Sequence, residues 1–190
     1  MIKEIYIDQD GVMANCVKAM LDIHSWDSPW PTPPIHHDCH EWWEDTRKMS
    51  MADFWKPIDQ DGKFWANISP YGWLDELLIA CAQAVGKENL FVLTSPHQHA
   101  NCYYGKVEWL EEYVPVVPKS QYIFCKQKGK LGSEGRLLID DKNENIDDFK
   151  AEGGEGLLFP QPWNRNWAVG DSMRMQYVKR ELELLMEEYE

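Results

Sequence analysis

Apolar residues along the chain fall into short runs of strand length and longer stretches with helical spacing. Residues 90–94 read LFVLT, a continuous apolar run that is typical of a strand covered on both faces. Residues 3–8 place Ile5 and Ile7 on one face of a short strand. The strands that this pattern predicts are 3–8, 90–94, 121–125, 136–139 and 156–159.

Segments with helical spacing lie between these runs. From 73 to 85, Leu74, Leu77 and Leu78 recur at helical intervals, and Gly86 marks the end of the segment. Short buried strands separated by helices indicate an α/β fold with a parallel sheet and right-handed crossovers. The predicted helices are 14–24, 73–85, 105–113, 145–150 and 172–189.

The stretch between the first two strands differs in composition from the rest. Residues 25–73 hold seven of the ten tryptophans and the proline-rich run PWPTPP. A short amphipathic helix is predicted at 50–57, where Ser50 is suited to be the N-cap. Such a segment is too long for one crossover. We therefore expect a mostly helical cap at 15–73, inserted into a core made of 1–14 and 74–190.

Length and charge indicate how many domains the chain forms and which partners it does not bind. The 190 residues suit one domain with a modest insertion. The chain has 32 acidic and 19 basic side chains and a formal net charge of −13. We therefore expect no nucleic-acid polymer and no anionic membrane as partner, because phosphate groups attract basic surfaces. The sequence leaves a homodimer open.

The chain shows no targeting or spanning segment. No apolar run approaches the roughly 20 residues that cross a bilayer, and the first residues lack the layout of a signal peptide. The five cysteines are an odd number without the spacing of a disulfide framework. We expect a cytoplasmic protein with reduced thiols.

Polar side chains stand at the carboxyl ends of four predicted strands, the edge where open parallel sheets bind ligands. Taken alone, Asp8 and Asp10 are equally typical of a turn, Thr94 and Ser95 are compatible with a helix N-cap, and the Asp140–Asp141 pair and the lysine run are more typical of a capping turn and a solvated charge run. Together, the carboxylates require a neutralising cation, and oxygen ligands favour Mg²⁺, while the lysines favour a phosphate group. The residues are Asp8, Asp10, Thr94, Ser95, Lys126, Lys128, Lys130, Asp140 and Asp141.

Three of these strand ends carry recognisable motifs. DQDGV after the first strand resembles motif I of the haloacid dehalogenase phosphohydrolases, VLTS resembles motif II, and LLIDD resembles motif IV. The chain is most similar to the 5'(3')-deoxyribonucleotidases of that superfamily, through TSP after the second strand, Lys106 in YYGKVEWLEEY, and Lys130 ten residues before Asp140. The resemblance implies a Rossmann-like three-layer core with a small helical cap inserted after the first strand.

The resemblance also implies roles for the carboxylates. Asp8 is expected to be the nucleophile that forms an aspartyl-phosphate, and Asp10 the general acid and then the general base. Mg²⁺ is expected on Asp8, the backbone carbonyl of Asp10, and Asp140. Asp141 is either a further ligand or a group that orients the ligands.

The same resemblance implies a phosphate site. Thr94 and Ser95 are expected to hold the phosphate, and Lys130 to neutralise its charge. Lys130 is preferred over its neighbours by spacing alone. Lys106 or Lys128 is expected to assist.

Aromatic residues of the cap are candidates for nucleobase contacts. Most large rings are buried for stability, but a small cap does not need so many. We therefore expect one or two to stack on a base. Trp43 and Trp65 are the first candidates, followed by Trp42 and Phe64.

Two further motifs have competing interpretations. Residues 36–40, HHDCH, lack a second ligand pair at zinc-site spacing, which favours a polar loop over a zinc site. Asn164 and Arg165 follow the last strand and either border the active-site edge or form a turn.

The sequence thus predicts a Mg²⁺-dependent phosphohydrolase that acts on (deoxy)ribonucleoside monophosphates. Two alternatives stay open: hydrolysis of another small phosphomonoester, and a nucleotide-binding module without turnover. Base, sugar and the position of the phosphate are not specified by these motifs.

Overall fold

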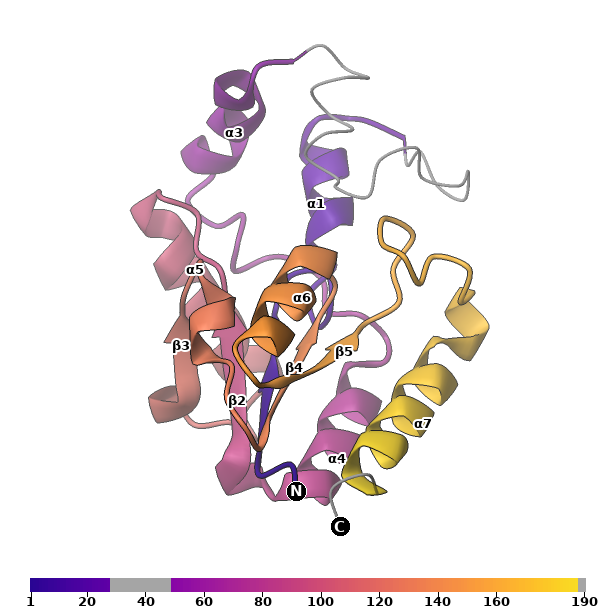
Figure 1. The fold of residues 1–190 in the computed structure, drawn as a ribbon. Coiled ribbons are helices and arrows are strands. Elements are labelled where there is room, and N and C mark those ends of the chain that lie inside the picture. Colours follow the sequence, from indigo (N-terminus) through magenta and orange to yellow (C-terminus); the bar gives the residue numbers. More distant parts are fainter. Residues whose placement is uncertain (28–48, 188–190) are drawn as a thin grey trace.

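The computed structural model describes residues 1–27 and 49–187, and a five-stranded parallel sheet lies at its centre (Figure 1). The sheet order is β3-β2-β1-β4-β5, so the order reverses beside β1 and a ligand crevice is expected beyond the carboxyl ends there. Ile5 of β1 pairs with Leu90 on one side and Leu137 on the other. The strands are β1 (Glu4–Ile7), β2 (Leu90–Thr94), β3 (Tyr122–Phe124), β4 (Arg136–Asp140) and β5 (Glu155–Leu158).

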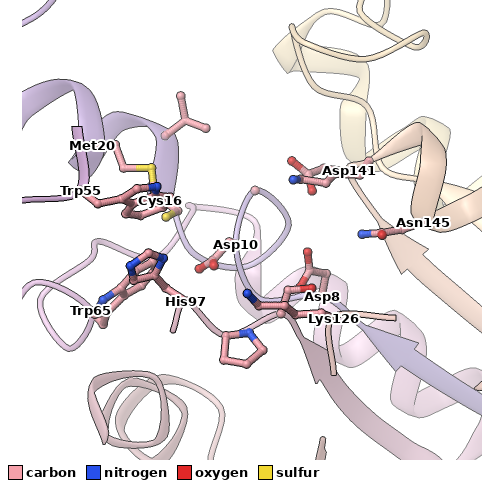
Figure 2. A pocket seen from close by; sticks show the side chains of 15 residues that line it. Asp8, Asp10, Cys16, Met20, Trp55, Trp65, His97, Lys126, Asp141 and Asn145 are labelled. Atoms are coloured by element: carbon pink, nitrogen blue, oxygen red, sulfur yellow. The ribbon is translucent and has the colours of Figure 1, made fainter. Parts of the chain in front are cut away.

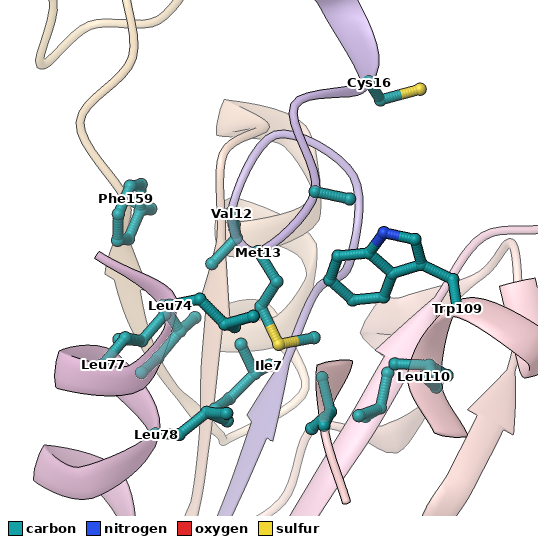
Figure 3. Close-up of a cluster of buried hydrophobic side chains, with 14 of the residues drawn as sticks. Ile7, Val12, Met13, Cys16, Leu74, Leu77, Leu78, Trp109, Leu110 and Phe159 are labelled. Carbon is teal, nitrogen blue, oxygen red and sulfur yellow. The ribbon is translucent and has the colours of Figure 1, made fainter. Parts of the chain in front are cut away.

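Helices cover both faces of the sheet, which confirms the predicted α/β class. Successive strand residues point to opposite faces. Ile5 and Ile7 therefore join the large cluster formed with α4, α5 and α7, whereas Tyr6 joins the smaller cluster under α6. Figure 3 shows Ile7 among side chains of the large cluster. The helices are α1 (Cys16–Ile23), α3 (Met51–Gln60), α4 (Leu74–Val85), α5 (Ala100–Tyr113), α6 (Asn143–Ala151) and α7 (Arg174–Glu187).

The predicted elements are present, with differences at their ends. Helix α5 begins at Ala100, five residues before the predicted start, because the side chain of His99 accepts a hydrogen bond from the backbone N–H of Asn101 and caps a polar first turn. Helix α7 begins after a 3-10 turn rather than at residue 172. The 3-10 turns are η1 (Lys87–Asn89), η2 (Lys119–Gln121), η3 (Lys128–Leu131) and η4 (Asp171–Met173).

The segment between β1 and α4 leaves the core and returns to it at adjacent points. Ala14 forms an isolated bridge with Pro70, and the N–H of Asn15 donates to the carbonyl of Ser69 at 2.9 Å. Helices α1 and α3 lie beyond the carboxyl end of the sheet, at the top of Figure 1. Ser50 caps α3 as predicted, since its side chain accepts from the N–H of Asp53.

Several predictions fall outside the described residues. Trp42, Trp43 and the 36–40 motif lie there, as does Cys39. Within the described residues, Cys81, Cys102 and Cys125 form no disulfide. Within residues 1–27 and 49–187, no helix combines the length and apolar character that crossing a membrane requires.

Candidate active site

The loop after β1 brings Asp8 and Asp10 to the carboxyl edge of the sheet. Gly11 follows with φ +80°, a conformation that side chains disfavour. A Cβ atom there would lie 2.1 Å from Oδ2 of Asp141. The side-chain amide of Gln161 donates a hydrogen bond to the Gly11 carbonyl and holds the turn from behind. Only glycine therefore lets the Asp8 loop approach the end of β4 so closely.

Three buried carboxylates meet at this edge. Asp8, Asp140 and Asp141 each offer an oxygen, and these atoms lie within 4.8 Å of one another. Burial raises the pKa of Asp8 to about 6, with Lys128 opposing the rise and Asp140 adding to it. Burial, followed by Asp140 and Asp8, raises the pKa of Asp141 well above its usual value. Such a cluster of oxygen donors is suited to a hard divalent cation.

Lys128 is the lysine that the fold brings to these carboxylates. Its Nζ lies 2.7 Å from Oδ1 of Asp8 and 2.6 Å from Oδ2 of Asp140, and its side chain is fully buried. Burial lowers the pKa of Lys128, but the charges of Asp140 and Asp8 outweigh that effect and the net pKa is raised. Lys128 is therefore charged and bridges the first and fourth strands.

Lys130, which spacing alone favoured, is exposed and makes no such contact. The reason is the 3-10 turn η3, which begins at Lys128. Gly129 packs against α6 so closely that a Cβ would lie 2.8 Å from the Cβ of Asp148. This packing directs Lys128 inward and leaves Lys130 on the outer side.

A second buried lysine connects the motif I loop to the end of β2. Lys106 Nζ lies 2.5 Å from Oδ2 of Asp10 and 2.6 Å from Oγ1 of Thr94. Burial lowers the pKa of Lys106, but Asp10 reverses the shift and the net pKa is raised. Gly105 allows the helix that carries Lys106 to pack closely against Trp65, because a Cβ at residue 105 would lie 2.6 Å from the Cβ of Trp65.

The lysine contact leaves Asp10 with one oxygen for chemistry. Oδ2 accepts from Lys106, while the buried Oδ1 has no hydrogen-bond partner within the described part of the chain. Asp10 is also the most exposed of the four aspartates, with a side chain 27% accessible. Asp10 also lines the pocket, so its carboxylate lies beside any group bound there.

The two aspartates after β4 are held by groups that the motifs did not reveal. The side-chain amide of Asn145 donates to both oxygens of Asp140 at 3.0 Å. Trp163 Nε1 donates to Oδ2 of Asp141 at 2.7 Å. Asn164 donates to the carbonyl of Asp141 at 2.8 Å, so this residue supports the site.

Arg165, in contrast, pairs with Asp147 on the surface at 2.7 Å. The run PWNRNW after the last strand was the available sequence signal for Trp163 and Asn164. The sequence does not reveal which of its polar residues face inward.

A pocket of about 370 Å³ opens in front of these groups. Figure 2 shows Trp55, Trp65 and His97 on one side of the pocket, and Asp8 and Asp141 on the other. The remaining lining residues are Asp10, Gly11, Cys16, Val17, Met20, Ser95, Pro96, Lys126, Lys142 and Asn145.

Of the predicted cap aromatics, Trp65 lines this pocket, although it is 97% buried. Phe64 is buried and packs edge-on against Trp65, with ring centroids 5.2 Å apart. Trp55 and His97, which form the same side of the pocket as Trp65, were not predicted to line it. Their place depends on contacts between α3 and the loop after β2, which are remote in sequence.

Comparisons with known proteins identify the family of the chain. A family model described as "5' nucleotidase, deoxy (Pyrimidine), cytosolic type C protein" matches residues 1–184. The chain is 28% identical over 174 residues to the 5'(3')-deoxyribonucleotidase of Bacillus subtilis (strain 168), covering 87% of this chain and 90% of that relative. The 5'(3')-deoxyribonucleotidase of Bacillus phage SPbeta gives the same values.

Solved structures show the same fold. A haloacid dehalogenase-like protein of Agrobacterium tumefaciens str. C58 has a TM-score of 0.59 at 10% identity, covering 97% of this chain and 99% of its own. A haloacid dehalogenase-like hydrolase of Xanthomonas campestris has a TM-score of 0.58 at 13% identity, with coverage of 100% and 95%. A Bacillus subtilis hydrolase of this type, solved bound to magnesium, has a TM-score of 0.52 at 10% identity, with coverage of 83% and 86%.

These findings confirm the resemblance that the motifs carried. The family model spans nearly the whole chain, and the solved structures share its parallel α/β fold. The protein has the fold of haloacid dehalogenase-like hydrolases, and it belongs to the family of the 5' nucleotidase, deoxy (pyrimidine), cytosolic type C proteins, which are phosphoric monoester hydrolases.

Proposed function

We propose that the protein is a Mg²⁺-dependent phosphatase that hydrolyses (deoxy)nucleoside monophosphates through a phosphorylated Asp8. The observation that carries the proposal is the pairing of Asp8 and Asp10 in one pocket, each beside its own buried lysine. The family membership and the 5'(3')-deoxyribonucleotidase names of the relatives support the substrate class.

The charge balance of the site fits a divalent metal. Asp8, Asp140 and Asp141 bring three carboxylates together, and the buried ammonium group of Lys128 neutralises one of them. Two negative charges remain, which one Mg²⁺ would neutralise, and all donors are oxygens. We assign Asp8, Asp140 and the backbone carbonyl of Asp10 as ligands. Asp141 is a ligand or orients them.

When bound, Mg²⁺ would draw negative charge from the phosphate oxygens. The orientation of Asp8 is set by the chain itself. Both the Gln9 N–H, at 2.8 Å, and Lys128, at 2.7 Å, contact Oδ1. The second oxygen of Asp8 is then the one that attacks phosphorus.

The proposed reaction has two steps. An oxygen of Asp8 forms a bond to phosphorus while the ester P–O bond breaks, and Asp10 gives its proton to the departing alkoxide. Water then attacks the same phosphorus, Asp10 takes the proton of that water, and Asp8 is released with inorganic phosphate. Thr94 and Ser95, at the end of β2, would bind phosphate oxygens, and Lys106 holds Asp10 and Thr94 in place.

The inserted segment would supply the nucleoside side of the pocket. We propose residues 15–73 as a cap and residues 1–14 and 74–190 as the catalytic core. Trp55 and Trp65 present aromatic surface opposite the carboxylates, as base stacking requires. Trp42 and Trp43 stay predictions.

Phosphate release from a panel of nucleoside monophosphates, with Mg²⁺ or with chelator, tests this function. We expect turnover only with Mg²⁺ and a preference for deoxynucleotides over sugar phosphates. Asp8→Asn should abolish turnover, since an amide is a poor nucleophile, while Asp147→Asn on the surface serves as the matched control. Equal activity on every small phosphomonoester would favour the broader phosphatase, and substantial activity of Asp8→Asn would refute the covalent step.

A further inference from the structure

We infer that His97 is a positioning residue that ties the phosphate-binding loop after β2 to helix α3, and so fixes the aromatic wall of the pocket. His97 lies two residues after Ser95, whereas its partners Trp55 and Asp59 lie on α3. The inference rests on the proposed function, because it assigns the wall to the nucleoside half of the substrate.

The first contact is an aromatic stack. The rings of His97 and Trp55 lie with centroids 4.1 Å apart and planes 21° apart. Trp55 in turn stacks on Trp65 at 6.4 Å, and Lys106 lies 5.3 Å from the centre of the Trp65 ring. A continuous row of packed groups therefore leads from His97 to the lysine that holds Asp10.

The second contact is polar. Nε2 of His97 lies 3.3 Å from Oδ1 of Asp59, and the two side chains are 11% and 28% accessible. Both atoms are buried and neither has a hydrogen-bond partner within the described residues, so the 3.3 Å approach is a polar contact rather than a formed hydrogen bond. A buried polar atom without a partner is costly, and each of these two atoms has the other within 3.3 Å, so the contact favours keeping α3 against the loop.

The other end of His97 is fixed to the core. Its backbone N–H donates to Sγ of Cys102 in α5 at 3.2 Å, and Ser95 donates to the carbonyl of Cys125 at 3.3 Å. Burial lowers the pKa of His97, although Asp59 opposes that shift. The ring is then neutral near pH 7 and lies beside Asp59 without adding charge to the phosphate side of the pocket.

The inference predicts that nucleoside affinity and the chemical step depend on different residues of the pocket. If His97 keeps α3 seated, its loss would let Trp55 move away while Asp8, Asp10 and Lys128 stay in place. Affinity for the nucleoside should then fall, and the chemical step should not. An aromatic pair is worth about 0.5–1.5 kcal/mol, which corresponds to about a two- to tenfold rise in KM.

The test compares His97→Ala, His97→Phe and Asp59→Asn with wild-type protein on a deoxynucleoside monophosphate and on para-nitrophenyl phosphate. Hydrogen exchange of residues 51–60 is followed in the same proteins without substrate. Gln98→Ala, an exposed neighbour in the same loop, is the matched control. Circular dichroism establishes that each variant is folded.

We expect His97→Ala to raise KM for the nucleotide about two- to tenfold, with kcat and the generic ester changed less than twofold, and to speed exchange in α3. His97→Phe keeps a ring on Trp55, so its KM for the nucleotide should lie between those of wild type and His97→Ala. Asp59→Asn should also raise this KM, by less than His97→Ala does. An equal loss on both substrates, or unchanged exchange in α3, would overturn the inference. If His97→Ala does not fold, Asp59→Asn decides by the same two measurements.

The exchange measurement needs no turnover. Faster exchange in α3 with no nucleotide hydrolysis by wild-type protein would contradict the proposed function but leave the tie between loop and helix standing. Nucleotide hydrolysis by wild-type protein, together with unchanged exchange in α3 of His97→Ala, would support the proposed function and contradict the role of His97.

Discussion

Replacing Lys128 with methionine tests which lysine belongs to the active site. The ion pairs in the structure indicate Lys128, whereas spacing in the sequence favoured Lys130. Lys128 is fully buried between Asp8 and Asp140, whereas Lys130 is exposed in the same turn. Methionine has a similar length and no charge, so Lys128→Met removes the ammonium group with little change of volume. Lys130→Met is the matched control, because it makes the same chemical change two residues away.

The structure sets the size of the expected effect. Removing one partner of a buried ion pair typically costs about 3–5 kcal/mol, because the remaining charge stays buried without compensation. Asp8, Asp140 and Asp141 would then repel one another with no cation among them. An exposed substitution usually changes stability by less than about 0.5 kcal/mol. With a urea m-value of about 3 kcal/mol/M, Lys128→Met should lower the unfolding midpoint by about 1–2 M.

Urea unfolding at pH 7.5, with chelator and with Mg²⁺, measures this difference, alongside phosphate release. Lys128→Met should be destabilised most with chelator and partly restored by Mg²⁺, which replaces the missing positive charge. Lys130→Met should match wild type in stability and retain nearly all activity. If Lys130→Met loses activity while Lys128→Met keeps it, the assignment from the buried ion pairs is wrong.

Three further outcomes are expected. Asp10→Asn should lower kcat by about 10²–10⁴-fold while Mg²⁺ affinity, measured by titration calorimetry, stays near wild type, because the proposed metal contact there is the backbone carbonyl; a large loss of Mg²⁺ affinity would contradict this. Gly11→Ala should reduce both the melting temperature and activity, since φ is +80° and the new methyl group would meet Asp141 at 2.1 Å; wild-type behaviour would be incompatible with that turn. The pKa of Asp8 is raised from 3.8 to about 6, so folding favours its protonated form, and the chelated protein should lose stability as pH rises from about 4 to 6. Mg²⁺ should reverse this loss above that range, as melting curves measured across the range would show. A difference between the two melting temperatures that does not depend on pH would argue against a metal on Asp8.

Local sequence was enough to predict the sheet and the residues at its edge. The apolar run at 90–94 and the alternation at 3–8 are short-range signals, and the carboxyl ends of parallel strands meet at one edge whatever the connecting loops do. The sequence therefore places Asp8, Thr94 and Asp140 at one edge of the sheet, and the observed strand order β2-β1-β4 makes them neighbours.

Only the tertiary structure decided which side chains complete the site. The choice between Lys128 and Lys130 depends on the 3-10 turn and on the packing of Gly129 against α6, and spacing in sequence does not reveal the direction of a lysine. The His97–Trp55 stack joins two residues 42 positions apart, whose meeting depends on how α3 is seated over the sheet. Trp163 reaches Asp141 by the same kind of long-range contact. Strand ends are fixed by backbone pairing, whereas side-chain contacts of this kind are set by packing between elements that are distant in the chain.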